Sequence, residues 1–194
     1  MLPRFTFAVG ILALFTMSEP AQSRVLRVCF APNMDCTTPI VEAIDAAKRE
    51  ILVQANGFTS CPIIQALARA KRRNVEVRIL LDRTNEQTRY YGYVDYLLRE
   101  NIEPKIDAPP GGIAHKKTIV IDRHLLISGS MNHTWKGQHR NVDVVYFFAG
   151  KPARVDESNW WQREAASRAL KPASANFRPR CGALEPKTQS ADNR

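Results

Sequence analysis

Residues 115–132 have the sequence HKKTIVIDRHLLISGSMN, which determines more of the fold than any other stretch of the chain. Two runs of β-forming residues, 117–121 and 125–128, flank a short polar segment, so the stretch predicts a β-hairpin with its turn at 122–124. Polar residues recur around this hairpin in the pattern H-x-K-x4-D-x6-G-S-x-N. With each type taken as about one residue in twenty, the chance of this pattern in a chain this long is on the order of 10⁻⁵. The pattern is therefore treated as a functional motif.

The residue types in this motif suit the chemistry of phosphate esters without a metal. The imidazole of His115 can attack phosphorus, and the side chains of Lys117, Ser130 and Asn132 can hold oxygens that gain negative charge in the transition state. Because side chains alternate along a strand, His115 and Lys117 are expected on one face, as are Ser130 and Asn132. Gly129 leaves room for a close backbone approach. We expect these residues to converge on one catalytic and phosphate-binding site.

Asp122 completes the motif, but its position predicts a different role. It lies five residues after Lys117, which gives it the opposite parity along a regular strand, and it falls in the predicted turn. A turn aspartate commonly accepts hydrogen bonds from nearby backbone amides. Asp122 is therefore a candidate site residue that we expect to brace the structure more than to contact substrate.

Outward from the hairpin, the sequence alternates between strand and helix signals. Helices are predicted at 38–47, 62–73, about 90–98 and 152–170, and strands at 25–30, 51–55, 75–81, 102–106 and 142–148. This alternation predicts an α/β fold with a mixed, largely parallel sheet flanked by helices on both faces. We expect one catalytic domain over residues 24–170 and a loosely ordered tail over 171–194.

The N-terminus has the pattern of a secretory signal. Arg4 precedes an apolar run over residues 5–17, and Ala21-Gln22-Ser23 offers small residues at the spacing that a signal peptidase prefers. A retained membrane anchor is the alternative, but the run is short against the ~20 residues that span a bilayer. We expect cleavage near Ser23 and a periplasmic or secreted protein.

Export makes the four cysteines disulfide candidates. Three pairings are possible. The pairing of Cys36 with Cys61 is favoured, because each is expected between a strand and a helix at the same edge of the sheet. Cys29 would then pair with Cys181, although free thiols at either position remain an alternative. No C-x-x-C pair occurs, so a zinc site is not expected.

The chain is strongly basic, with 28 lysines and arginines against 19 acidic residues and a net charge of +9. Such a surface attracts polyanions, nucleic acid above all, although anionic lipids and solubility are served by it too. Trp135, which follows the motif, could stack on a nucleobase or pack at a subunit interface.

The motif resembles the signature of the phospholipase D superfamily, HKD followed by G-S-x-N. The order of elements over residues 25–168 is similar to that of the small bacterial endonucleases of this superfamily, the Nuc type. The resemblance implies a phospholipase D-like fold, His115 as a nucleophile that forms a phosphohistidine, and Lys117, Ser130 and Asn132 as the phosphate clamp. It also implies no metal or other cofactor, and a carboxylate behind the nucleophile at Asp143, where the Nuc type usually has glutamate.

This mechanism needs two histidines, and the chain has one H-x-K. The other three histidines, His124, His133 and His139, start no second motif. The resemblance therefore implies a homodimer in which two copies of His115 share one site. Two functions remain open: a nuclease acting on DNA or RNA, favoured by the basic surface, and a phospholipase D acting on lipid head groups. The second would be expected to show an apolar loop rim or interfacial helix, and the sequence indicates neither.

Overall fold

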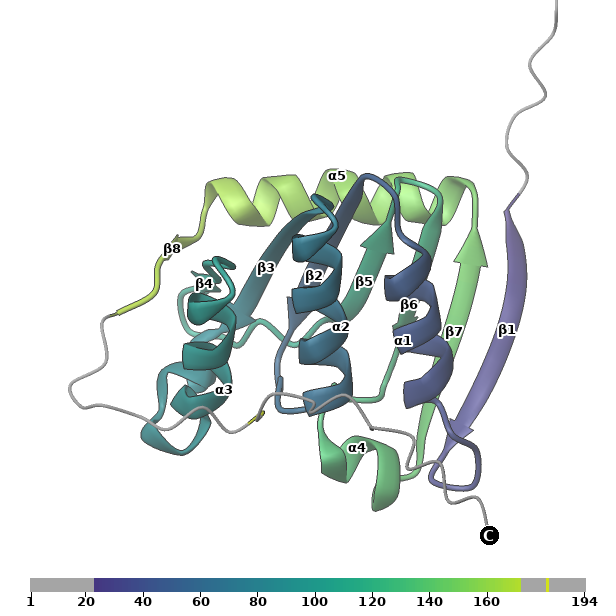
Figure 1. Ribbon diagram of the computed structural model, residues 1–194, viewed down its shortest axis with the longest axis horizontal. Coiled ribbons are helices and arrows are strands. Elements are labelled where there is room, and N and C mark those ends of the chain that lie inside the picture. The colour runs from purple at the N-terminus through teal and green to yellow at the C-terminus, as the bar shows by residue number, and fades with distance from the viewer. Residues whose placement is uncertain (1–22, 172–180, 182–194) are drawn as a thin grey trace, which may run out of the picture.

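The computed structural model describes residues 23–171 and Cys181 of the 194-residue chain, without the side chains of residues 88–92. Its strands form one eight-stranded sheet in the order β1-β7-β6-β5-β2-β3-β4-β8 (Figure 1). The strands are β1 (Arg24–Ala31), β2 (Glu50–Ala55), β3 (Glu76–Asp82), β4 (Lys105–Asp107), β5 (Lys117–Ile121), β6 (Leu125–Gly129), β7 (Asp143–Ala149) and β8 (Arg168–Ala169). The helices are α1 (Thr37–Ala46), α2 (Cys61–Arg72), α3 (Thr88–Arg99), α4 (Trp135–His139) and α5 (Lys151–Ala165), with a 3₁₀ turn, η1 (Arg83–Glu86).

The sheet is mixed and flanked by helices, as predicted, but its parallel part is smaller than expected. Among the strands described, β2 pairs with β3 and β3 with β4 in parallel, whereas the other five pairings are antiparallel. The prediction assumed that every strand–helix alternation returns the chain in the same direction. Instead, β5 enters antiparallel beside β2, and the hairpin of β5 with β6 then continues into β7 without a crossover helix.

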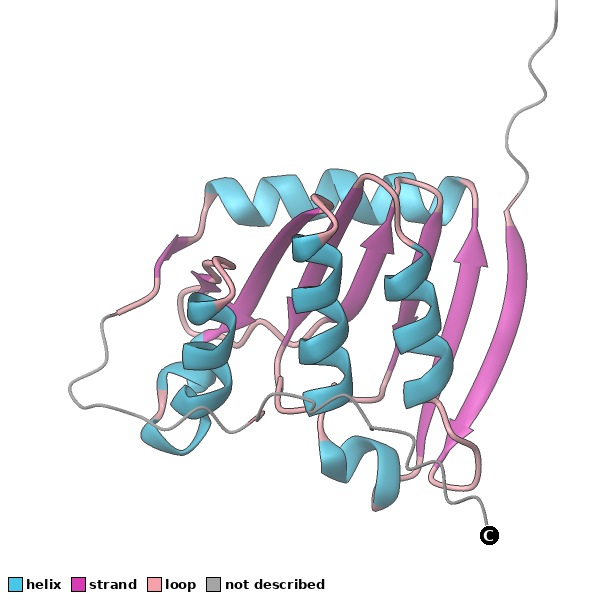
Figure 2. Ribbon diagram, viewed as in Figure 1, coloured by secondary structure: helices cyan, strands magenta, loops and turns pink. Residues whose placement is uncertain are grey.

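Helices α1, α2 and α3 cover one face of the sheet and α5 crosses the other (Figure 2). The larger core lies under α1 and α2 and includes Ile40 and Leu67. A smaller core joins α5 to the central strands through Trp160, Leu52 and Val120. The indole Nε1 of Trp160 donates to the carbonyl of Val53 at 2.9 Å, so this large ring is buried without leaving its polar atom unpaired. The central strands thus have apolar side chains on both faces.

The predicted disulfide pairing is wrong. Cys29 bonds Cys36, seven residues along the chain, and Cys61 bonds Cys181 across a separation of 120 residues. Cys36 directly precedes α1 and Cys61 begins α2, both at the same edge of the sheet, as expected. The turn between β1 and α1, however, folds Cys36 back onto Cys29, with 5.6 Å between their Cα atoms. Cys61 is then left for the C-terminal cysteine.

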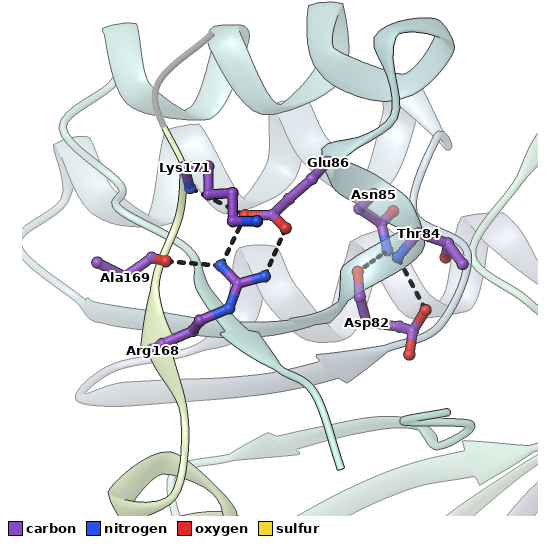
Figure 3. Close-up of polar contacts among 7 residues, drawn as sticks. All are labelled: Asp82, Thr84, Asn85, Glu86, Arg168, Ala169 and Lys171. Carbon is purple, nitrogen blue, oxygen red and sulfur yellow. Dashed lines mark hydrogen bonds and ion pairs between the residues drawn. The ribbon is translucent and has the colours of Figure 1, made fainter. Parts of the chain in front are cut away.

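Several element boundaries differ from the predicted ones. The fourth strand begins at Lys105, because Ile102 instead closes the end of α3 through its amide, which donates to the carbonyl of Leu97. Helix α5 ends at Ala165, and the short strand β8 follows it. Arg168 in β8 forms an ion pair with Glu86 of η1, which joins this C-terminal strand to the end of β3 (Figure 3). The predicted signal, 1–23, and tail, 171–194, lie outside the described residues except at residues 23, 171 and 181.

No helix among residues 23–171 has the length and apolar character needed to cross a membrane. In the same part of the chain, no three histidine, cysteine or acidic side chains gather in a way that could hold a metal ion.

Candidate functional site

The motif residues other than Asp122 lie at one edge of the sheet, where β2 and β6 end and β5 and β7 begin. Lys117 pairs with Ala55 in β2, and Gly129 pairs with Val145 in β7. A loop leads to His115, which is exposed immediately before β5. The predicted strands therefore deliver the two halves of the motif to the same place.

The side chain of Lys117 contacts the backbone of His115, the candidate nucleophile. This side chain is buried, and its Nζ donates to the carbonyl oxygen of His115 at 2.7 Å. Burial lowers the pKa of the Lys117 ammonium, and the negative charge of Asp143 opposes this shift. The neighbouring Lys116 instead forms an ion pair with Asp156 of α5, on the other face of the sheet. This alternation places Lys117 on the face expected from parity.

Ser130 and Asp143 are joined directly. The Ser130 hydroxyl donates to Asp143 Oδ1 at 2.7 Å and accepts from the amide of Val144 at 3.1 Å. The second oxygen of Asp143 is buried and has no hydrogen-bond partner within the described part of the chain. Asp143 thus presents one free carboxylate oxygen, with the charge of Lys117 near enough to interact with it. A buried oxygen of this kind is suited to accept a proton or hydrogen bond from an imidazole.

The glycine of the motif is required by packing. A Cβ atom built on Gly129 would lie 2.0 Å from the carbonyl oxygen of Val144. Real side chains do not approach backbone this closely, so any other residue would push β6 away from β7. Because Ser130 directly follows Gly129 and Asp143 begins β7, Gly129 keeps the two halves of the site together.

Asn132 is fixed by the loop that follows β2. Its Oδ1 accepts from the amide of Gly57 at 3.3 Å. The next residue, His133, is buried, and its carbonyl accepts from the amides of Thr59 and Ser60 at 2.9 Å each. The segment after β6 is therefore attached to β2 on one side and to β7 on the other.

His133 is a feature of the site region that the sequence did not single out. Burial, with a smaller contribution from the positive charge of Lys117, lowers the pKa of His133 to about 4. Its ring meets Phe58 edge-on, and its Nδ1 has no hydrogen-bond partner among the described residues. An imidazole in this setting is neutral at ordinary pH. The position directly after Asn132 was its only signal in the sequence.

Asp82 is a second residue that sequence reasoning missed. It is fully buried at the end of β3. One carboxylate oxygen accepts from the amide of Thr84 at 2.9 Å, and the other accepts from the amide of Ala114 at 2.7 Å. Figure 3 shows Asp82 beside Thr84 and Asn85 of η1. Since Ala114 immediately precedes His115, Asp82 anchors the loop that presents the nucleophile candidate. An acidic residue closing an apolar strand was the available signal.

Asp122 lies at the opposite end of β5, in the predicted hairpin. Its backbone φ is 51°, and its carboxylate accepts from the amides of Lys48, Arg49 and Glu50 at 2.8–3.0 Å. Burial alone would raise the pKa of Asp122, but these amide hydrogen bonds together lower it. These contacts match the bracing role expected for it, and they separate it from the cluster at the other end of the strand.

Comparison with known proteins places this geometry in a family. Residues 40–164 match the family model described as cardiolipin synthase, PLD-like domain. A phospholipase D of Rickettsia prowazekii (strain Madrid E) is 38% identical over 157 residues, which cover 80% of this chain and 75% of that protein.

Solved structures agree with the sequence comparisons. Nuc from Salmonella typhimurium, a phospholipase D family member, matches with a TM-score of 0.71 and 27% identity over 78% of this chain and 100% of that one. NucT from Helicobacter pylori has the same fold, with a TM-score of 0.68 at 18% identity over 76% of this chain and 99% of that one. The chain therefore belongs to the phospholipase D superfamily.

Proposed function

We propose that this protein is a metal-independent phosphodiesterase that hydrolyses DNA or RNA through a covalent phosphohistidine. The observation that carries the proposal is the cluster of motif residues at the sheet edge. There the ammonium of Lys117 donates to the carbonyl of His115, and the hydroxyl of Ser130 donates to the carboxylate of Asp143. The basic charge of the chain, +9, favours a polyanionic substrate. The resemblance to Nuc-type endonucleases and the structural likeness to Nuc support the same class.

In the first step, an imidazole nitrogen of His115 forms a bond to phosphorus while the bond from phosphorus to the leaving oxygen breaks. Lys117 and Asn132 donate to the remaining oxygens as their negative charge increases. The hydroxyl of Ser130 has one hydrogen, which it gives to Asp143 in the free protein, so it joins the clamp by turning that hydrogen to the phosphate when substrate binds. Asp143 orients the nucleophile through its unpaired oxygen. We assign Asp122 to bracing the hairpin. The leaving oxygen takes a proton from a second histidine.

In the second step, water attacks phosphorus and gives a proton to that second histidine. The phosphorus–nitrogen bond then breaks, which restores His115 and releases the phosphate product. Each histidine therefore returns to its starting state, and no metal is needed to activate the water.

The second histidine is proposed to come from another copy of the chain. His133 is unsuited to be the acid, because it is buried away from substrate and this burial lowers its pKa to about 4. The ring of His139 packs at a tilt against Trp135, with 4.9 Å between ring centroids. His124 lies in the hairpin turn at the far end of β5. A two-fold homodimer that brings two copies of His115 together supplies the missing acid.

The two disulfides favour an oxidising compartment, so we propose that residues 1–23 direct export and are then removed. Recovery of the mature protein with an N-terminus near Arg24 from the periplasm or medium would support this, and an intact Met1 in the exported protein would contradict it.

The second candidate function is hydrolysis or transfer of phospholipid head groups. It is favoured by the name phospholipase D carried by the Rickettsia relative and by two exposed apolar side chains close to the site, Ile113 and Val142. Both substrate classes contain a phosphodiester, so the same cluster could act on either.

One experiment tests the nuclease proposal and separates it from the alternative. Purified mature protein is offered plasmid DNA, single-stranded DNA and phosphatidylcholine vesicles side by side in EDTA. We expect cleavage of the nucleic acids, loss of that activity in His115→Ala, and full activity in the control His124→Ala. Nuclease activity that survives in His115→Ala would overturn the role of His115. Turnover of the vesicles alone would establish the lipid reaction instead.

A further inference from the structure

A pocket of about 740 Å³ lies against one member of the proposed phosphate clamp, Asn132. Its lining also includes the aromatic residues Tyr93 and Trp135. Lys136 and Asn141 add polar groups to the same wall. We propose that Trp135 is a stacking platform for the nucleobase next to the scissile phosphate, and that it gives the enzyme a preference for single-stranded nucleic acid. This inference rests on the proposed nuclease function and extends it to substrate form.

The backbone that carries Trp135 packs closely against the clamp residue Asn132. Trp135 begins α4, whose first turn is capped by the Thr134 hydroxyl accepting from the amide of Gly137 at 3.0 Å. A Cβ atom on Gly137 would lie 2.2 Å from the carbonyl oxygen of Asn132, so the helix packs against the clamp residue with no space between them. A base stacked on Trp135 would therefore have a fixed position relative to a phosphate held by Asn132.

The indole is exposed, and two residues at the end of α4 and just after it contact its ring. Trp135 has 56% of its surface exposed. The guanidinium of Arg140 lies 5.5 Å from its ring centroid, and the ring of His139 packs at a tilt of 38°. Arg140 and Lys136 give the platform positive charge, which suits a base attached to a phosphate backbone.

Charge also indicates which side of Trp135 the nucleotide occupies. A second pocket, of about 770 Å³, shares Trp135 but is lined by the acidic residues Asp35 and Glu42. Those carboxylates would repel a phosphate backbone. The pocket that contains Asn132 has cationic Lys136 instead, so we assign the nucleotide to that side.

Stacking on a protein side chain requires a base that is free of its neighbours. Bases of a duplex are already stacked and paired, and extruding one costs a few kcal/mol. Freeing a base of a single strand costs much less free energy, and any base can stack on an aromatic side chain. A stacking site beside the clamp therefore predicts discrimination by strandedness with little dependence on sequence.

The test measures binding in the His115→Ala background, so that substrate is not consumed. Fluorescence anisotropy compares a labelled twelve-nucleotide thymidine oligomer with an abasic oligomer of the same length and charge. We expect Trp135→Ala to weaken binding of the thymidine oligomer roughly ten-fold and to leave the abasic oligomer unchanged. The matched control is Trp161→Ala. Trp161 is also partly exposed and also has an arginine, Arg78, over its ring. It lies on α5, which covers the face of the sheet opposite α1, α2 and α3.

The outcomes separate the possible roles of Trp135. Equal loss of binding for both oligomers, or a change in oligomeric state, would assign the residue to packing or to a subunit interface and overturn the proposal. Unchanged binding of the thymidine oligomer would overturn it as well. Turnover of the same oligomers by the enzyme with His115 intact tests the nuclease function separately, because the binding result does not depend on cleavage.

Discussion

The clearest structural prediction concerns Asp82, which contacts no predicted site residue yet anchors the loop before His115. In Asp82→Asn, the side-chain amide can accept from only one of the two backbone amides that the carboxylate now binds, those of Thr84 and Ala114. The other backbone N–H would face the NH₂ group of the asparagine, which is also a donor. That N–H would then lose its hydrogen bond at a fully buried position. Leaving a buried donor unsatisfied costs about 1–3 kcal/mol, and hydrogen bonds to charged groups lie toward the upper end.

We therefore expect Asp82→Asn to lower the free energy of unfolding by about 2 kcal/mol, or roughly 4 to 8 °C in Tm for a domain of this size. The larger effect should fall on turnover, because a misplacement of about 1 Å in a catalytic group can cost ~100-fold. Thermal unfolding followed by circular dichroism measures the first effect. Steady-state hydrolysis of bis(p-nitrophenyl) phosphate, well below Tm, measures the second.

Asp107 provides the matched control. It pairs with Asp82 in the register of β4 and β3 and is equally buried, but its carboxylate binds Gln54 and Arg163 instead of the loop before His115. Asp107→Asn should lose comparable stability with kcat nearly unchanged. If both variants lose stability and both keep the kcat of the parent protein, Asp82 is a structural residue and the inferred positioning of His115 is wrong.

Two further predictions concern the segment around Asn132. The pKa of His133 in the folded protein is about 4, below its ordinary value of 6.5. Between these pH values the unfolded chain binds a proton that the folded protein does not. The free energy of unfolding should therefore fall by up to about 3 kcal/mol as pH drops from 6.5 to 4. Urea unfolding across this range should show the loss in the parent protein and a smaller one in His133→Phe; parallel pH profiles would contradict the buried neutral imidazole. Gly129→Ala should lower Tm and kcat together, because its Cβ would lie 2.0 Å from the carbonyl oxygen of Val144, whereas the control Gly112→Ala meets nothing closer than 3.9 Å and should change neither.

The parts of the fold that were predictable from sequence are those fixed by local pattern. The hairpin turn at 122–124 follows from two β-forming runs and a short polar segment, and the structure gives Asp122 and Arg123 the positive φ values that such a turn uses. Lys117 and Lys116 point to opposite faces as parity predicts, because alternation along a strand is set by the backbone alone. The turn position of Asp122 likewise predicted that its carboxylate would accept from backbone amides, as it does.

The parts that were mispredicted depend on contacts between distant segments. The share of parallel pairing depends on where β5 inserts into the sheet, and nothing within residues 117–121 specifies its neighbour. Cysteine pairing likewise depends on how the turn after Cys29 folds back. Asp82 and His133 were missed because their importance comes from what the chain packs around them, at Ala114 and Phe58 respectively.

The covalent phosphohistidine on His115 is the central claim, and the stereochemistry of the reaction tests it most directly. An oligonucleotide with a single phosphorothioate linkage of known configuration is cleaved in ¹⁸O-water, and the configuration at phosphorus in the product is determined. Two successive in-line displacements, first by His115 and then by water, predict overall retention. Inversion would mean that water attacks the substrate directly, and it would contradict the account.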